Sequence, residues 1–207
     1  MKYPQLLSTY PIISFQVSRR ELEIILSHLE TKLADGASGA IVEFGCYTGT
    51  TSLFIRRLLD AYQLSNDFHV YDSFEGLPEK TKKDQSPIGL QFRAGELSTS
   101  KKSFIATFKK AGLRTPRIHR AWFNELADTD IPNDIMFAFL DGDYYESVMT
   151  SLVHIWPKLA SGAVIIVDDY ANEALPGAKR AVDEWIVTHA VDLRVESSLA
   201  ILQFTNR

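Results

Sequence analysis

Several features that mark whole classes of proteins are scarce in this sequence. It has a single cysteine, Cys46, among 207 residues, so an intramolecular disulfide is excluded and a reducing, cytoplasmic location is expected. Its longest apolar stretches, such as residues 163–167, are far too short to span a membrane. The first residues lack the apolar core of a signal peptide. The sequence therefore predicts a soluble protein with no membrane partner.

An excess of positive charge is also missing. Lys and Arg number 22 against 26 Asp and Glu, which gives a net charge of −4. A strongly basic footprint for nucleic acid is absent, so we expect no nucleic-acid partner. The 45% of hydrophobic residues is ordinary for a globular protein and excludes wholesale disorder. The length suits one domain.

Short apolar runs alternate with helical patterns along the chain. Strands are predicted at residues 40–44, 68–71, 117–121, 135–140, 163–167, 193–195 and 199–204. Helices are predicted at residues 18–33, 51–62, 100–112, 145–159 and 177–189. This alternation predicts an α/β fold, a single doubly wound, mostly parallel seven-stranded sheet with a C-terminal antiparallel hairpin. We place the domain at residues 18–207, after an irregular N-terminal arm at residues 1–17.

A turn with two glycines follows the first predicted strand. Residues 43–51 read E-F-G-C-Y-T-G-T-T, where Gly45 permits a tight turn and Gly49 lets a ligand approach the helix start. Tyr47 occupies the middle position of the dinucleotide fingerprint, and no Gly-Lys-Ser/Thr follows, so neither that fingerprint nor a P-loop is present. Glu43 is unusual in an apolar strand, and its carboxylate can hold a cation or a hydroxyl. A plain strand-to-helix turn is the alternative.

Polar or flexible residues stand where four predicted strands end, at Gly45, Asp72, Asp141 and Asp168. In open α/β sheets, ligands bind beyond the carboxyl ends of the strands. Asp72 comes about 23 residues after Gly49, where an acidic residue commonly accepts both hydroxyls of an adenosyl ribose. A solvated aspartate at a strand end is the alternative.

Carboxylates gather after two strands that should be neighbours. Asp141 and Asp143 follow one strand, and Asp168 and Asp169 follow the next. Crowded carboxylates repel one another unless a cation or a proton compensates. Oxygen ligands without Cys or clustered His favour Mg²⁺ or another hard divalent cation over zinc. Such a cation would lower the pKa of a bound substrate hydroxyl, whereas solvated turn residues are the alternative.

Four segments together resemble the macrocin O-methyltransferase (TylF) family of class I S-adenosylmethionine-dependent enzymes. They are residues 43–51, residues 72–78 (D-S-F-E-G-L-P), residues 140–147 (L-D-G-D-Y-Y-E-S) and residues 161–170 (S-G-A-V-I-I-V-D-D-Y). The first is also similar to that of catechol-type O-methyltransferases, which hold a divalent metal beside the methyl donor. The resemblance covers about residues 38–190 and implies a Rossmann-like methyltransferase domain.

The resemblance implies roles for the matched residues. Glu43 and Gly45 would line the methionine part of the cofactor, and Asp72 its ribose. The adenine end would lie at Ser73 and at the turn of Trp122. The expected set of cofactor-binding residues is Glu43, Gly45, Tyr47, Gly49, Thr51, Asp72, Ser73, Trp122 and Asp141. The implied metal ligands are Asp141, Asp168 and Asp169, with Asp141 also the catalytic base and Asp143 in a lesser role that orients the loop.

The sequence thus predicts an S-adenosylmethionine-dependent, divalent-cation-assisted O-methyltransferase. Its acceptor would be a small hydroxylated molecule, of sugar or natural-product type. Residues 80–97 are expected to form a mobile cover, with an ordinary solvated loop as the alternative. One alternative is a metal-dependent phosphohydrolase, which would lack a cationic phosphate motif and leave Asp72 and Glu43 unexplained. The other is a non-catalytic module that binds adenosyl ligands, in which the carboxylate cluster would serve no purpose.

The N-terminal arm carries much apolar surface, at Tyr3, Leu6, Leu7, Tyr10, Ile12, Ile13 and Phe15. Apolar surface of this extent on an arm predicts a packing partner. We expect the arm to pack across a neighbouring subunit in a homo-oligomer or over the mouth of the cofactor site.

Overall fold

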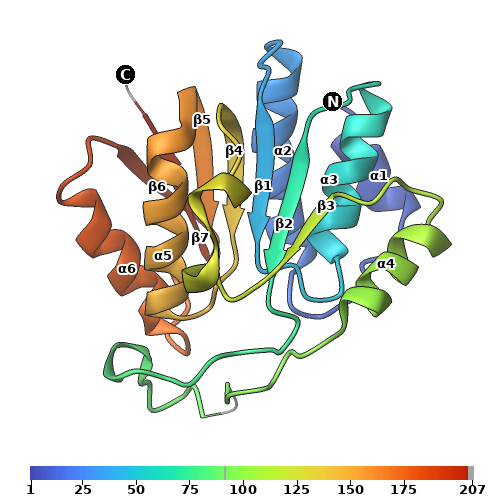
Figure 1. Cartoon of the computed structure of the whole chain (residues 1–207). Coiled ribbons are helices and arrows are strands. Elements are labelled where there is room, and N and C mark those ends of the chain that lie inside the picture. The colour runs from blue at the N-terminus through green and yellow to red at the C-terminus, as the bar shows by residue number, and fades with distance from the viewer. Residues whose placement is uncertain (91, 205–207) are drawn as a thin grey trace.

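The computed structural model describes residues 1–90 and 92–204 (Figure 1). Seven strands form one sheet in the order β3-β2-β1-β4-β5-β7-β6. They are β1 (Ala40–Phe44), β2 (Phe68–Asp72), β3 (Arg117–Arg120), β4 (Ile135–Leu140), β5 (Leu159–Val167), β6 (Asp192–Glu196) and β7 (Leu199–Gln203). The first five pair in parallel, and β7 runs antiparallel to both β5 and β6. The predicted doubly wound sheet with its antiparallel hairpin is confirmed.

Helices cover both faces of this sheet. They are α1 (Tyr3–Thr9), α2 (Arg19–Ala34), α3 (Thr50–Ala61), α4 (Lys101–Lys110), α5 (Tyr145–Ile155) and α6 (Pro176–Ile186). The helices α1 to α4 pack on one face and α5 and α6 on the other. Neighbouring residues of β1 serve the two cores in turn, since Ile41 belongs to the first and Val42 to the second. Burial on both faces explains why the central strands are continuously apolar.

The N-terminal segment is more regular than predicted. The expectation of an irregular arm is wrong for residues 3–9, which form α1. Pro4 fits because it stands in the first turn, where its missing N–H costs nothing. Leu7 is buried in the core shared with α2 and α3. A capping box then begins α2, with Ser18 Oγ accepting from the N–H of Glu21.

Two boundaries near β5 also differ from prediction. Helix α5 ends at Ile155, and a 3₁₀ turn, η4 (Trp156–Lys158), follows it. Pro157 cannot continue an α-helix, which explains this early end. Strand β5 therefore begins at Leu159, earlier than the predicted residue 163.

A long connection between β2 and α4 crosses beyond the carboxyl ends of the strands (Figure 1). It contains the 3₁₀ turn η1 (Lys82–Asp84). Leu77 from this connection packs with Tyr144 and Leu175 in a small separate core. The connection is therefore fastened to the segments that follow β4 and β5. Among the helices of the described residues, none is long and apolar enough to cross a membrane.

Candidate active site

A cavity of about 490 Å³ lies at the carboxyl edge of the parallel strands. Its walls include Gly45 after β1, Asp72 at the end of β2, Trp122 beyond β3, Asp141 after β4 and Asp169 beyond β5. The parallel strands deliver these residues to one place because their carboxyl ends meet at one edge of the sheet. The volume is in the range of sites for small molecules.

The turn after β1 depends on its glycines. Gly45 has φ +82°, and a Cβ there would lie 1.9 Å from the carbonyl oxygen of Asp141. Gly49 has φ +90°, and a Cβ there would lie 2.8 Å from the ring of Phe104. Gly45 and Tyr47 line the cavity, whereas Gly49 lies at the N-cap of α3. Of the predicted cofactor residues in this turn, the structure therefore brings two to the cavity.

Two further predicted cofactor residues are buried. Thr51 lies in the first turn of α3. Glu43 accepts a hydrogen bond from Ser52 Oγ at 2.6 Å and is 1% exposed. Burial raises the pKa of Glu43 to about 8, with a smaller contribution from the charge of Asp72, while the bond from Ser52 opposes the shift. Glu43 and Thr51 are thus not among the residues that line the cavity.

Asp72 joins the end of β2 to the glycine turn. The N–H groups of Cys46 and Tyr47 donate to its Oδ2 at 2.9 and 3.0 Å. The N–H of Phe74 donates to its Oδ1 at 2.7 Å. A carboxylate oxygen has two acceptor positions, so Oδ1 can take one more donor. Asp72 both shapes the turn and faces the cavity, as does its neighbour Ser73.

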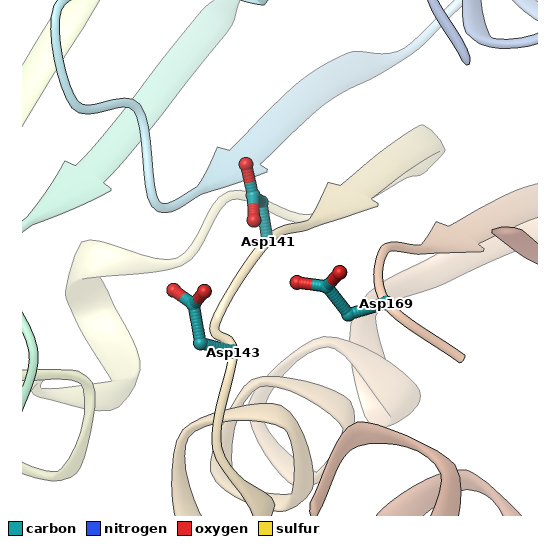
Figure 2. Close-up of side chains that lie close together, drawn as sticks. All are labelled: Asp141, Asp143 and Asp169. Carbon is teal, nitrogen blue, oxygen red and sulfur yellow. The ribbon is translucent and has the colours of Figure 1, made fainter. Parts of the chain in front are cut away.

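Three carboxylates converge in the wall of the cavity. Asp141, Asp143 and Asp169 each offer an oxygen, and these oxygens lie within 4.8 Å of one another (Figure 2). The side chains come from the turns that follow β4 and β5, which are paired so that Leu140 stands opposite Val167. The prediction that these two strands lie side by side is confirmed.

The composition of this group differs from the predicted ligand set at one position. Asp168 is buried, and the N–H of Asp169 donates to its Oδ1 at 2.8 Å. Asp143, which was given a lesser role, takes its place in the group. Both Asp143 and Asp169 have φ +57°, so the backbone turns sharply at each. The Asp-Gly-Asp pattern is the sequence signal for this turn, since a Cβ on Gly142 would lie 2.9 Å from Ser147 Cβ.

The carboxylates of Asp141, Asp143 and Asp169 are close enough to repel one another. Burial raises the pKa of Asp141, and the charges of Asp168, Asp143 and Asp169 raise it further. Burial also raises the pKa of Asp143, with contributions from Asp169 and Asp72. No lysine, arginine or histidine is among the described residues that line the cavity. The site is therefore suited to a positively charged ligand, and three carboxylate oxygens are a donor set for a hard cation.

The N-terminal segment contributes Phe15 and Gln16 to the cavity wall. This position agrees with the second placement expected for the arm, over the mouth of the site, while packing across a subunit stays a prediction. Phe15 is fully exposed (105%) although its segment is anchored. Thr50 Oγ1 donates to Ser14 Oγ at 3.2 Å, and the Arg57 guanidinium lies 3.9 Å from the centre of the Tyr10 ring.

Other walls of the cavity were not assigned from the sequence. An apolar wall comes from the long connection and from the segment after β5, namely Leu77, Pro78, Phe92, Leu97 and Leu175. The first turns of α5 contribute Glu146, Ser147 and Thr150, and a later residue of this helix, His154, hydrogen-bonds to the carbonyl of Phe123, which also lines the cavity. Leu77, Pro78, Glu146 and Ser147 belong to the segments 72–78 and 140–147 that carry the resemblance, which pointed to them without giving them a role. Phe92, Leu97, Thr150 and Leu175 belong to no such segment, and the fold alone brings them to the cavity.

Comparison with known proteins gives one family. A profile of the macrocin-O-methyltransferase (TylF) family matches residues 10–198. The chain is 32% identical over 165 residues to the 8-demethyl-8-(2,3-dimethoxy-alpha-L-rhamnosyl)-tetracenomycin-C 4'-O-methyltransferase of Streptomyces olivaceus, covering 76% of this chain and 63% of that protein. It is 28% identical over 192 residues to the mycinamicin III 3''-O-methyltransferase of Micromonospora griseorubida, covering 88% of this chain and 74% of that one.

Among solved structures, the O-methyltransferase NovP superposes with a TM-score of 0.79 at 27% identity, covering 90% of this chain and 80% of that chain. This chain therefore spans less than two thirds of the length of the Streptomyces olivaceus protein, but most of NovP.

Proposed function

This chain belongs to the macrocin O-methyltransferase (TylF) family, and we propose that it transfers a methyl group from S-adenosylmethionine to a sugar hydroxyl of a natural-product-type molecule, assisted by a divalent cation. One observation carries the proposal. Asp141, Asp143 and Asp169 converge in the same cavity as the glycine turn, without a cationic side chain among its described lining residues. The acceptor class follows the name of the Streptomyces olivaceus relative, which methylates a rhamnosyl tetracenomycin.

The cavity fits the methyl donor in shape and in charge. When bound, S-adenosylmethionine supplies an electrophilic methyl group on a positively charged sulfur. The lining carboxylates favour that positive charge, and Asp72 has an acceptor position left for a ribose hydroxyl. Gly45 allows close approach to the backbone, and the rings of Trp122 and Phe123 offer faces for the adenine. Ser73 stands beside Asp72 in the same wall.

The convergent carboxylates fit a hard divalent cation such as Mg²⁺. Asp141, Asp143 and Asp169 would hold it, and the buried Asp168 directly precedes Asp169 in the sequence. A cation there would polarise the acceptor hydroxyl and favour its deprotonated form. Asp141 is predicted to be the base, and Asp143 lies beside it in the same wall, so we assign proton acceptance to this pair.

The two alternative functions account for less of the cavity. A phosphohydrolase would need positive charge to hold its substrate, and the described lining residues include none. A non-catalytic adenosyl-binding module would give the convergence of three carboxylates no catalytic use.

The proposal is tested by methyl transfer from radiolabelled S-adenosylmethionine to a panel of rhamnosides and other glycosides. We expect a methylated product from the wild type and from the Asp35→Asn control, whose aspartate is exposed and outside the cavity. The Asp169→Asn variant should give little product. Failure of the wild type to bind S-adenosylhomocysteine in calorimetry would overturn the proposal.

A further inference from the structure

The long connection carries a buried carboxylate that the proposed reaction does not use. Asp84, at the end of η1, is 1% exposed. The N–H of Tyr145 donates to its Oδ1 at 2.7 Å. The N–H and the hydroxyl of Thr81 donate to its Oδ2 at 2.9 and 2.6 Å. Three donors from two distant parts of the chain therefore solvate this charge.

The contact with Tyr145 completes the start of α5. The first N–H groups of a helix have no partner within it, and an N-cap side chain usually accepts one. The N-cap of α5 is Tyr144, which makes no such bond. Asp84 supplies the acceptor from 61 residues earlier in the chain. Its negative charge also suits the positive end of the helix dipole.

Helix α6 leaves room for this contact. A Cβ on Gly177, in the first turn of α6, would lie 2.0 Å from Asp84 Oδ1 and 2.6 Å from the nitrogen of Tyr145. The φ of Gly177 is not in the left-handed region, so backbone conformation alone does not call for glycine there. Glycine is needed at position 177 because any side chain there would clash with the Asp84 carboxylate. The connection, α5 and α6 thus meet at one buried point.

The same elements are joined again at the surface. Lys83 Nζ lies 3.5 Å from the centre of the Tyr145 ring and 3.0 Å from a carboxylate oxygen of Glu184 in α6. Exposed contacts of this kind contribute little to stability. They join the long connection, α5 and α6 a second time, at the surface of the protein.

Asp84 thereby links two walls of the cavity. The connection that it fastens supplies Leu77 and Phe92 to the apolar wall, and Tyr144 donates from its hydroxyl to the carbonyl of Phe92 at 3.2 Å. The turn that carries Asp141 and Asp143 leads directly into α5. We propose that Asp84 is a positioning residue, which locks the apolar wall of the cavity to the turn that carries the reacting carboxylates. This role rests on the proposed function, but the contact itself can be tested without it.

Two variants break the contact from opposite sides. Asp84→Asn cannot accept hydrogen bonds on both sides of its side chain, and Gly177→Ala places a methyl group on the carboxylate. In hydrogen exchange with S-adenosylhomocysteine bound, we expect the Tyr145 amide and loop residues 77–86 to exchange at least about tenfold faster in both variants. The double variant should exchange no faster than either single one, because both remove the same contact.

The catalytic readout separates positioning from stability. We expect both variants to lower kcat for methyl transfer about tenfold while S-adenosylhomocysteine affinity changes less than about twofold. Glu184→Gln controls for the exposed contact, and Leu29→Ala controls for lost stability because it opens a cavity in the other core. Both controls should keep kcat near that of the wild type.

Unchanged exchange at Tyr145 in both variants would overturn the proposal, whether or not the protein methylates anything. A kcat that falls no further than in Leu29→Ala would reduce Asp84 to a structural residue and would also overturn it. Absence of methyl transfer by the wild type would instead count against the proposed function, and the exchange measurement would then decide on Asp84.

Discussion

Two carboxylate sites near the start of α5 differ in their surroundings. One is the single residue Asp84, and the other is the group of Asp141, Asp143 and Asp169. Asp84 is buried and accepts hydrogen bonds from one N–H of α5 and from two groups of Thr81. Asp141, Asp143 and Asp169 face one another, and burial together with their mutual repulsion raises the pKa of Asp141. A carboxylate whose donors are in place stabilises the fold. A group that repels itself costs folding free energy and is explained by a positively charged ligand.

The largest effect is expected when one charge of the Asp141, Asp143 and Asp169 group is neutralised. Asp141→Asn and Asp169→Asn should lower turnover about a hundredfold to a thousandfold, because the cation and the acceptor oxygen lose a charged contact. The same variants should leave the free energy of unfolding unchanged or higher, since repulsion is removed. Single-turnover methylation and urea unfolding measure the two effects. Loss of stability together with full turnover would show that Asp141 and Asp169 stabilise the fold and take no part in the reaction.

Both carboxylate oxygens of Asp72 accept hydrogen bonds, as those of Asp84 do, and Asp72 also lines the cavity, as the three-carboxylate group does. Three N–H groups satisfy it, and it also faces the cavity. Asp72→Ala should weaken S-adenosylhomocysteine binding by roughly 1–3 kcal/mol, because ribose hydroxyls lose a charged acceptor and the glycine turn loses its anchor. Calorimetry measures this, with Asp35→Asn as the control. Unchanged affinity would remove Asp72 from the cofactor site.

Glu43 is a buried carboxylate with one donor, Ser52. Its pKa of about 8, above the usual 4.5, means that the folded state retains a proton that the unfolded chain releases. Its contribution to stability is therefore most favourable below pH 4.5 and is lost as pH rises to about 8.

Glu43→Gln should remove this pH dependence. Relative to the wild type, the variant should gain more than about 1 kcal/mol in free energy of unfolding between pH 5 and pH 8. Urea unfolding of both proteins across that range tests the expectation. Parallel stability curves would show that Glu43 titrates normally.

Substitution of Phe15, an uncharged side chain in the cavity wall, has the smallest expected effect. Because it is fully exposed at the cavity wall, Phe15→Ala should leave the melting temperature unchanged. The KM for a glycoside with an apolar scaffold should rise about threefold to tenfold, since one aromatic contact is lost. The KM for S-adenosylmethionine serves as the internal control. An equal rise in both would place Phe15 at the cofactor instead.

The sequence allowed the sheet to be predicted because its signals are local. Apolar runs such as residues 135–140 mark strands buried on both faces, and Ser18 with Glu21 marks the start of α2. The meeting of the Asp141 turn with the turn after β5 follows from strand pairing alone.

The remaining features depend on contacts that are distant in sequence or on the direction of single side chains. The grouping of Asp143 with Asp141 and Asp169 depends on positive φ at Asp143 and Asp169, and the Asp-Gly-Asp pattern indicates a turn without specifying where each side chain points. Helix α1 was missed because Pro4 and Pro11 suggested irregular structure, whereas its burial against α2 and α3 favours a helix. The contact of Asp84 with α5 joins residues 61 positions apart. Only the folded chain displays it.

Removal of divalent cations tests the central claim most directly, because it acts on the Asp141, Asp143 and Asp169 group and not on Asp84. After extensive chelation with EDTA, the wild type should still bind S-adenosylhomocysteine, and it should unfold at a lower urea concentration because the carboxylates lose the cation that offsets their repulsion. Its methyl transfer to the acceptor found in the glycoside panel should fall at least about tenfold, and added Mg²⁺ should restore it. Full methylation by the chelated protein would contradict the account and would leave the Asp141, Asp143 and Asp169 group without a cation to hold.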